Sequence, residues 1–96
     1  MSQEAGRIKW GILGCGKIAG KFARALVRSS TGMLHAVSSR NGEKARAFAL
    51  EHGALNSYGD YASLLADPEV RAVYVATPHP LHGEWSIKAL RAGKAV

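Results

Sequence analysis

The feature that most constrains the fold is a glycine-rich turn between an apolar run and an amphipathic segment. Residues 8–13 are mostly apolar, and Gly14-x-Gly16-x-x-Ala19 follows directly. From Lys17 onward, apolar residues recur at helical spacing. This order predicts a buried parallel strand, a tight turn and a helix.

Each small residue in the turn has a distinct expected role. Gly14 permits a turn too tight for a Cβ atom, Gly16 lets a pyrophosphate approach the backbone, and Ala19 lets the helix pack closely on the strand. Phosphates would bind at the positive start of the helix, near Lys17 and Ile18. The alternative is a tight turn that binds nothing. The candidate cofactor-binding residues here are Gly14, Cys15, Gly16, Lys17 and Ile18, with Cys15 interpreted as a small filler residue.

Strands and helices are expected to alternate along the rest of the chain. The helix over 17–29 should bury an apolar stripe of Ile18, Phe22, Ala25 and Leu26. Asn41-Gly42 is a turn signal that leads into the next helix. Asp60 is a good N-cap for a short helix whose inner face is Tyr61, Leu64 and Leu65. Further strands are expected at 33–38, 54–58 and 71–76, with helices at 43–52, 61–66 and 81–92.

This alternation predicts an α/β fold with a doubly wound parallel sheet of Rossmann type. The strand order would be 3-2-1-4-5, with the chain truncated inside the fifth strand at Ala95-Val96. Residues 8–96 would form one nucleotide-binding domain after an N-terminal extension at 1–7, with no substrate domain. The open edge of the fourth strand could pair with another chain, so a homo-oligomer is one expectation.

Composition narrows the class of protein. The chain has 96 residues, a hydrophobic fraction of 47%, one cysteine and a net charge of +6. It contains no bilayer-spanning run and no signal-like N-terminus, so we expect a cytoplasmic protein without a membrane partner. The basic residues are scattered, and the four on one face of the first helix suit a solvated surface, so we expect no nucleic-acid partner.

The end of the second strand carries a second candidate site. An acidic residue about 20 positions past the glycine turn would indicate NAD. Ser38, Ser39 and Arg40 stand there instead, and Lys44 follows one helical turn later. A hydroxyl and a guanidinium can hold a 2′-phosphate, which favours NADP over NAD. The alternative is that Arg40 is a solvated loop cation.

The third candidate site is the loop after the fourth strand, at the switch point of the sheet. It contributes Ala76, Thr77, Pro78, His79, Leu81 and His82 as cofactor-binding candidates. His79 could contact the cofactor or support the loop, and His82 could act in acid–base chemistry or, as we favour, in capping and packing. Because no further ligand completes a set with the two histidines, no metal site is expected.

Several motifs in order resemble the amino-terminal half of the Gfo/Idh/MocA (glucose–fructose oxidoreductase/inositol dehydrogenase) family. They are GILGCGKIA at 11–19, SR at 39–40 with EKA at 43–45, YGDY at 58–61, VATP at 75–78, His82, and AGKAV at 92–96. The serine–arginine step most resembles the NADP-using dihydrodiol and sugar dehydrogenase branches.

The resemblance implies a two-domain NAD(P)-dependent oxidoreductase acting on sugars, cyclitols or related alcohols and ketones. The cofactor would lie across the loops at 14–18, 39–40 and 77–79, although the family usually has asparagine at the position of His79. The family's proton-relay lysine would lie beyond Val96, so no catalytic residue is assigned and the 96 residues alone are expected to be inactive.

Other functions stay open at the level of sequence. A nucleotide-sensing or subunit-interaction module would use the open sheet edge for docking. A basic nucleic-acid binder would show salt-sensitive retention. A methyl-donor-binding Rossmann protein would bind an adenosine ligand in place of NADP.

Overall fold

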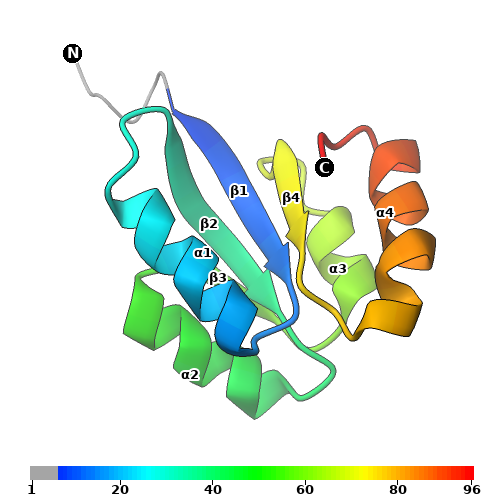
Figure 1. Ribbon diagram of the computed structural model, residues 1–96, viewed down its shortest axis with the longest axis horizontal. Coiled ribbons are helices and arrows are strands. Elements are labelled where there is room, and N and C mark those ends of the chain that lie inside the picture. The colour runs from blue at the N-terminus through cyan, green and yellow to red at the C-terminus, as the bar shows by residue number, and fades with distance from the viewer. Residues whose placement is uncertain (1–6) are drawn as a thin grey trace.

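The computed structural model describes residues 7–96 and contains a four-stranded parallel sheet. The strands are β1 (Ile8–Leu13), β2 (Gly32–Ser38), β3 (Asn56–Tyr58) and β4 (Ala72–Val75), in the order β3-β2-β1-β4. Figure 1 shows them running in one direction, with helices between them. The predicted α/β class and the order of its first four strands are confirmed.

Two of the helices in residues 7–96 begin after a residue whose side chain caps them. The helices are α1 (Lys17–Val27), α2 (Gly42–His52), α3 (Tyr61–Leu65) and α4 (His82–Arg91), with a 3-10 turn η2 (His79–Leu81) before the last. Asn41 caps α2, because its side chain accepts hydrogen bonds from the amides of Glu43 and Lys44 at 3.0 and 3.2 Å. Asp60 caps α3 through the amide of Ser63 at 2.7 Å.

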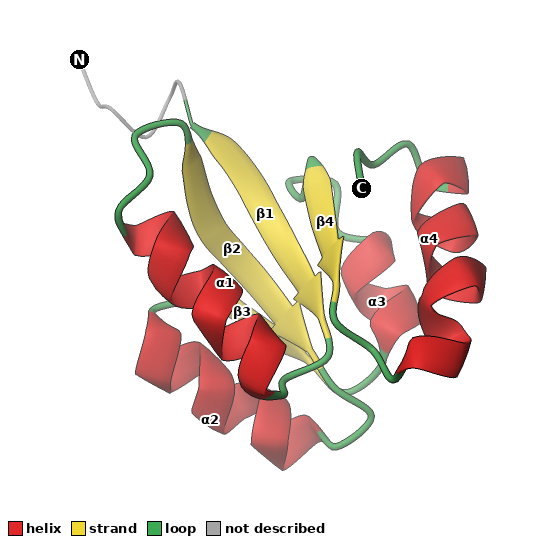
Figure 2. Ribbon diagram, in the orientation of Figure 1, coloured by secondary structure: helices red, strands yellow, loops and turns green. Residues whose placement is uncertain are grey.

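Helices cover both faces of the sheet and form two cores (Figure 2). On the α1–α2 face, Ile12, Leu34 and Val37 pack with residues of α1 and Phe48 of α2. On the α3–α4 face, Leu13, Ala36 and Val73 pack with residues of α3 and Ala89 of α4. The near-continuous apolar strands are explained by this burial on both sides.

The strands end together at one edge of the sheet, from which the connections to α1, α2 and η2 depart (Figure 1). At the side of the sheet, Ala95 forms an isolated parallel bridge with Ala72. The outer side of β4 is therefore partly covered where the sequence predicts a fifth strand. None of the helices within residues 7–96 combines the length and apolarity that a bilayer crossing requires.

The predicted buried stripe of α1 is partly wrong. Ile18 is 61% exposed and Ala25 is also exposed. The buried residues of the helix are Ala19, Gly20, Ala23 and Leu26. Small residues at this face let the helix lie close to the sheet, and Ile18 falls outside that face.

The alternation of β2 is interrupted at His35. Trp10 pairs with Leu34, whereas Gly11 pairs with Ala36, so His35 is an extra residue relative to β1. Leu34 and Val37 accordingly pack on the same face although they are three positions apart. Such a bulge re-aims a side chain locally, and here it places His35 among polar residues from β3 and from the segment before β4.

Candidate cofactor cleft

Three loops at the carboxyl edge of the sheet surround a cleft of about 630 Å³. Its size is within the range of small-molecule and cofactor sites. The lining residues are Gly14, Cys15, Gly16, Lys17, Ile18, Ser39, Arg40, Asn41, Lys44, Tyr61, Ala76, Thr77 and Pro78. The cleft therefore brings together the three candidate sites that the sequence separates by more than twenty residues each.

The glycine turn has the backbone that its sequence predicts. Gly14 has φ +103°, and a Cβ atom there would lie 2.6 Å from the carbonyl oxygen of Ala76. This position must remain glycine for two reasons, the left-handed backbone and the close approach of the next loop. A Cβ atom on Gly16 would meet no atom of the described residues within 4 Å. The protein itself therefore does not need a glycine here for packing, and the space is open to a ligand.

The start of α1 is open to an anion. Gly16 is the N-cap, no side chain of residues 7–96 caps the helix, and its first turn contains no acidic residue. The first amides of a helix have no partner within the helix and carry the positive end of its dipole. These amides border the cleft through Gly16, Lys17 and Ile18, where a phosphate group would find donors.

The opposite wall supplies positive charge. Ser39 is buried, and its hydroxyl accepts a hydrogen bond from the amide of Asn41 at 3.2 Å. Arg40 and Lys44 are exposed, and neither forms an ion pair with another residue in 7–96. The lining residues within the described part of the chain include three cations and no carboxylate, so their electrostatic field favours an anionic ligand.

The loop after β4 lines the third side. Thr77 is 4% exposed, and its hydroxyl has no hydrogen-bond partner among the described residues. His82 lies at the start of α4, and its Nε2 atom is hydrogen-bonded to the carbonyl oxygen of Thr77. Leu81 and His82 are not among the lining residues, and the side chain of His79 is outside the described part of the structure.

Cys15 lines the cleft but is poorly suited to react. Burial raises the pKa of its thiol to about 11, and nearby Lys44 only partly opposes this increase. Its Sγ atom is 3.4 Å from the carbonyl oxygen of Ser38. These observations agree with its interpretation as a small residue that fills the turn.

Two lining residues, Asn41 and Tyr61, were not among the sequence candidates. Asn41 was recognised only as a turn residue, and Tyr61 only as an apolar residue of α3. Asn41 comes shortly after the end of β2, and Tyr61 shortly after the end of β3. This position after a parallel strand is the signal that could have identified them.

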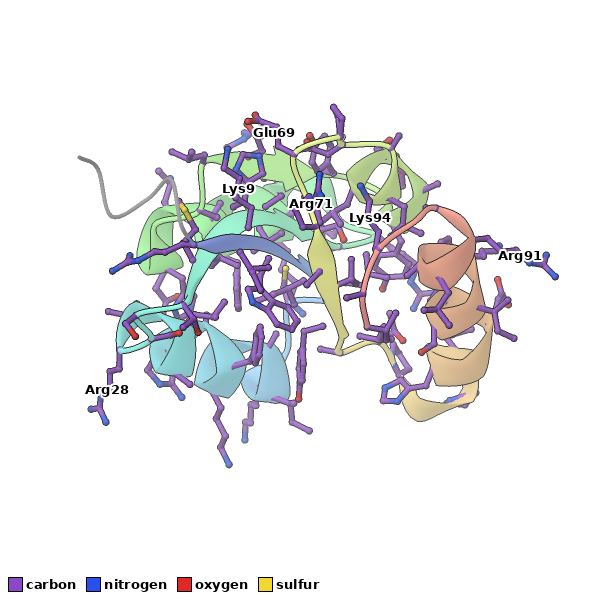
Figure 3. All side chains as sticks on the ribbon, turned by 90° about the horizontal axis from the view of Figure 1, so that it is seen from above. Lys9, Arg28, Glu69, Arg71, Arg91 and Lys94 are labelled. Carbon is purple, nitrogen blue, oxygen red and sulfur yellow. The ribbon has the colours of Figure 1, made fainter. Side chains whose placement is uncertain are left out.

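A second polar group lies away from the cleft and is centred on Asp67, which precedes β4 at the edge of the sheet where the strands begin. This Asp67 cluster comprises His35, Asn56, Tyr58, Asp67 and Lys94. Asp67 is 8% exposed; its carboxylate accepts hydrogen bonds from the Tyr58 hydroxyl at 2.8 Å and the Glu69 amide at 2.9 Å, and its carbonyl accepts one from Lys94 at 2.7 Å. Figure 3 looks onto this edge and shows Lys94 near Arg71, with Lys9 and Glu69 beside each other.

The hydrogen bonds of the cluster determine its ionisation. Burial opposes the charge on Asp67, but the bonds from Tyr58 and the Glu69 amide outweigh it and lower the pKa of the carboxyl group. Burial and the neighbouring carboxylate together raise the pKa of Tyr58 to about 12. The pKa of Glu69 is lowered by its ion pair with Lys9, whose Nζ atom lies 2.7 Å away.

His35, Asp67 and Glu69 offer atoms within 4.8 Å of one another, which is close enough to consider a metal ion. The carboxylates, however, already hold Tyr58 and Lys9. A divalent cation would have to displace these partners, so we assign the group to structural support.

Comparison with known proteins identifies the family. The profile described as an oxidoreductase family with an NAD-binding Rossmann fold matches residues 8–96. An oxidoreductase of Rhizobium meliloti is 41% identical over 90 residues, which cover 93% of this chain and 27% of that protein. The trans-1,2-dihydrobenzene-1,2-diol dehydrogenase of Mus musculus is 38% identical over 93% of this chain and 27% of its own length.

Solved structures share the fold. A 3-ketoreductase from Actinomadura kijaniata in complex with NADP has a TM-score of 0.87 and 37% identity, covering 92% of this chain and 28% of its own. Scyllo-inositol dehydrogenase from Lactobacillus casei, with bound NAD(H) and scyllo-inositol, has a TM-score of 0.83 and 25% identity, covering 92% and 26%. This chain spans about a quarter of the length of the curated relatives described above. It belongs to the Gfo/Idh/MocA oxidoreductase family and corresponds to the NAD-binding Rossmann fold of that family.

Proposed function

We propose that this chain binds a nicotinamide dinucleotide, with NADP preferred over NAD, as the cofactor-binding segment of an oxidoreductase. The activity would be hydride transfer between the cofactor and a sugar, cyclitol or dihydrodiol-type alcohol or ketone. The observation that carries the proposal is the cleft at the uncapped start of α1, which combines unpartnered amides with Arg40 and Lys44.

The residues present suit the diphosphate of such a cofactor. Gly16 leaves open space at the helix start, and the amides of the first turn supply donors without an ion. Lys17 adds a cation at the same point. In this arrangement the chain holds the diphosphate mainly through its backbone, which makes the contact insensitive to most side-chain changes.

The preference for NADP rests on the residues after β2. Ser39, Arg40 and Lys44 line the cleft where an acidic residue would favour the 2′-hydroxyl of NAD. Arg40 can give paired N–H donors to a phosphate and is otherwise without an ion-pair partner among residues 7–96. Both NADP and NAD(H) occur in the related structures, so this wall is the discriminating feature we propose for this chain.

The proposed substrate class is that of the relatives, and the proposed role of each part of the cleft follows from its position in the fold. The bound cofactor would supply the hydride-transferring nicotinamide. The residues of this chain would bind and orient it: the α1 start would hold the diphosphate, the Arg40 wall the adenosine end, and the Thr77 loop the remaining side of the cleft. No residue of this chain is assigned the proton transfer.

Calorimetric titration of the chain with NADPH and NADH, repeated for Arg40→Asp, tests the proposal. We expect the parent to bind NADPH more tightly than NADH. The variant should lose about 10- to 100-fold in NADPH affinity, because it removes charge-assisted hydrogen bonds and adds a repelling carboxylate. It should then bind NADH at least as tightly as NADPH.

Arg46→Asp is the matched control. Arg46 is an exposed residue of α2 that does not line the cleft, and its replacement changes the net charge by the same amount. Equal losses in both variants would mean that long-range charge, and not a local phosphate contact, governs affinity. Absence of binding by the folded parent to both nucleotides would contradict the proposed function itself.

A further inference from the structure

We propose that His82 is a positioning residue that holds the Thr77 wall of the cleft against the glycine turn and thereby sets the affinity for the cofactor. This inference rests on the proposed function. It assigns His82 an indirect role, because the side chain acts through the backbone of Thr77 and is not among the residues that line the cleft.

The first observation is the hydrogen bond that closes the loop after β4. The Nε2 atom of His82, in the first residue of α4, is bonded to the carbonyl oxygen of Thr77. Because a carbonyl only accepts, Nε2 carries the proton and donates it. Within the closed segment, the amide of Leu81 also donates to the carbonyl of Pro78 at 2.8 Å. Two consecutive carbonyls at the beginning of the loop, those of Thr77 and Pro78, are therefore bonded to residues at the start of α4.

The second observation is the contact on the other side of the same backbone. A Cβ atom on Gly14 would lie 2.6 Å from the carbonyl oxygen of Ala76 and 3.2 Å from the amide nitrogen of Thr77. The missing side chain of Gly14 thus allows the two loops to touch. A shift at Thr77 would change the width of the cleft beside the uncapped start of α1.

The third observation is the condition of Thr77 itself. The residue is 4% exposed, and its hydroxyl has no partner among the described residues, although the residue lines the cleft. A buried hydroxyl without a partner is unfavourable unless a ligand or water supplies one. The position of this hydroxyl relative to the cofactor therefore depends on what holds the Thr77 backbone, and His82 does so.

Three replacements separate the hydrogen bond from the volume of the ring. Gln can donate from its side-chain amide at a similar reach, whereas Phe keeps a ring and Leu keeps an apolar side chain, but neither can donate. NADPH affinity is measured by calorimetry, and amide exchange of Leu81 is measured by NMR in the ligand-free chain. Circular dichroism checks that each variant is folded.

We expect His82→Phe and His82→Leu to weaken NADPH binding about tenfold, as loss of one hydrogen bond implies, and to accelerate exchange of the Leu81 amide. His82→Gln should stay within about threefold of the parent in both measurements. A purely space-filling role for the ring would instead make Phe better tolerated than Gln.

If all three variants bind like the parent, or if Phe binds better than Gln, the positioning role is wrong while the proposed function stands. If the folded parent binds no nicotinamide nucleotide, the proposed function and the effect of His82 on affinity fail together. The exchange rates then still decide whether His82 holds the loop, because they are measured without ligand.

Discussion

The cleft and the Asp67 cluster differ in how their charged groups are partnered. In the cleft, the amides at the start of α1, the hydroxyl of Thr77 and the charge of Arg40 have no partner among the described residues. In the cluster, the carboxylate of Asp67 is equally polar and more deeply buried than Arg40, but it accepts hydrogen bonds from Tyr58 and from the Glu69 amide. Groups that the chain satisfies itself stabilise the fold, and groups that it leaves open are available to a ligand.

The same contrast separates helix starts within the carboxyl edge. The helices α2 and α3 begin at Asn41 and Asp60, whose side chains accept hydrogen bonds from helix amides. The helix α1 begins at Gly16, which has no side chain to do so. A capping residue usually stabilises a helix by about 1 kcal/mol relative to alanine. Glycine at the N-cap costs only a few tenths of a kcal/mol relative to such a residue. The start of α1 therefore leaves its amide donors open to a diphosphate at little cost in stability.

The largest expected effect comes from giving α1 the kind of cap that α3 has. Gly16→Asp places a carboxylate where a Cβ atom meets no protein atom within 4 Å, at backbone angles that a capping residue accepts. We expect stability to stay equal or rise slightly, and NADPH affinity, measured by calorimetry, to fall at least about 100-fold, because the carboxylate occupies the amides and repels the diphosphate.

A variant that is as stable as the parent and still binds NADPH normally would remove the distinction between the helix starts. Thermal unfolding of both proteins, recorded without ligand, provides the stability measurement. A large loss of stability would likewise contradict the open space described at Gly16.

A smaller effect, on stability alone, is expected in the Asp67 cluster. Tyr58→Phe removes the hydroxyl that donates to Asp67 at 2.8 Å. We expect a loss of about 2 kcal/mol, in the range for a hydrogen bond to a charged group, and a decrease of roughly 10 °C in the unfolding midpoint. Chemical denaturation measures the loss of unfolding free energy, and thermal unfolding measures the decrease in the midpoint temperature. Affinity for NADPH should be unchanged in the folded variant, since Tyr58 does not line the cleft.

Tyr74→Phe is the matched control, since Tyr74 stacks on Phe22 with ring centroids 4.2 Å apart and its ring would remain.

The pKa of Tyr58 is raised from 10.0 to about 12 in the folded chain, so its contribution to stability is complete below pH 10 and is lost as pH rises toward 12. The pKa of Asp67 is lowered from 3.8, so its contribution is present above that pH and is lost as pH falls through the folded value. Equal effects of the two substitutions, or the same dependence of stability on pH in the parent and in Tyr58→Phe, would remove the special role of the cluster.

The sequence predicts well what is encoded within a few neighbouring residues. The strand, glycine turn and helix around Gly14 follow from local periodicity and from residues that only one backbone conformation suits. The predicted cap at Asp60 is local for the same reason, because its side chain reaches an amide three positions ahead. Asn41 is predicted only as a turn residue, although its cap on α2 is equally local. The three loops of the cleft could be placed together because parallel strands end at one edge.

What could not be predicted depends on contacts between distant segments. The Asp67 cluster joins β2, β3, the segment before β4 and Lys94, and no spacing in the sequence reveals their meeting. The bulge at His35 breaks the alternation on which strand analysis relies. The prediction for Ile18 is wrong because periodicity indicates a helix but does not determine which of its neighbouring apolar positions faces the sheet.

The central claim is that backbone amides at the start of α1 hold a diphosphate in space that Gly16 leaves open. Calorimetric titration of NADPH into the parent, Gly16→Ala and Gly83→Ala tests it most directly, because a Cβ atom at either glycine meets no protein atom within 4 Å and Gly83 does not line the cleft. We expect equal affinity for the parent and Gly83→Ala, and affinity at least about tenfold weaker for Gly16→Ala, where the methyl group enters the space of the ligand. Equal binding by all three proteins, or no binding by the folded parent, would contradict the claim.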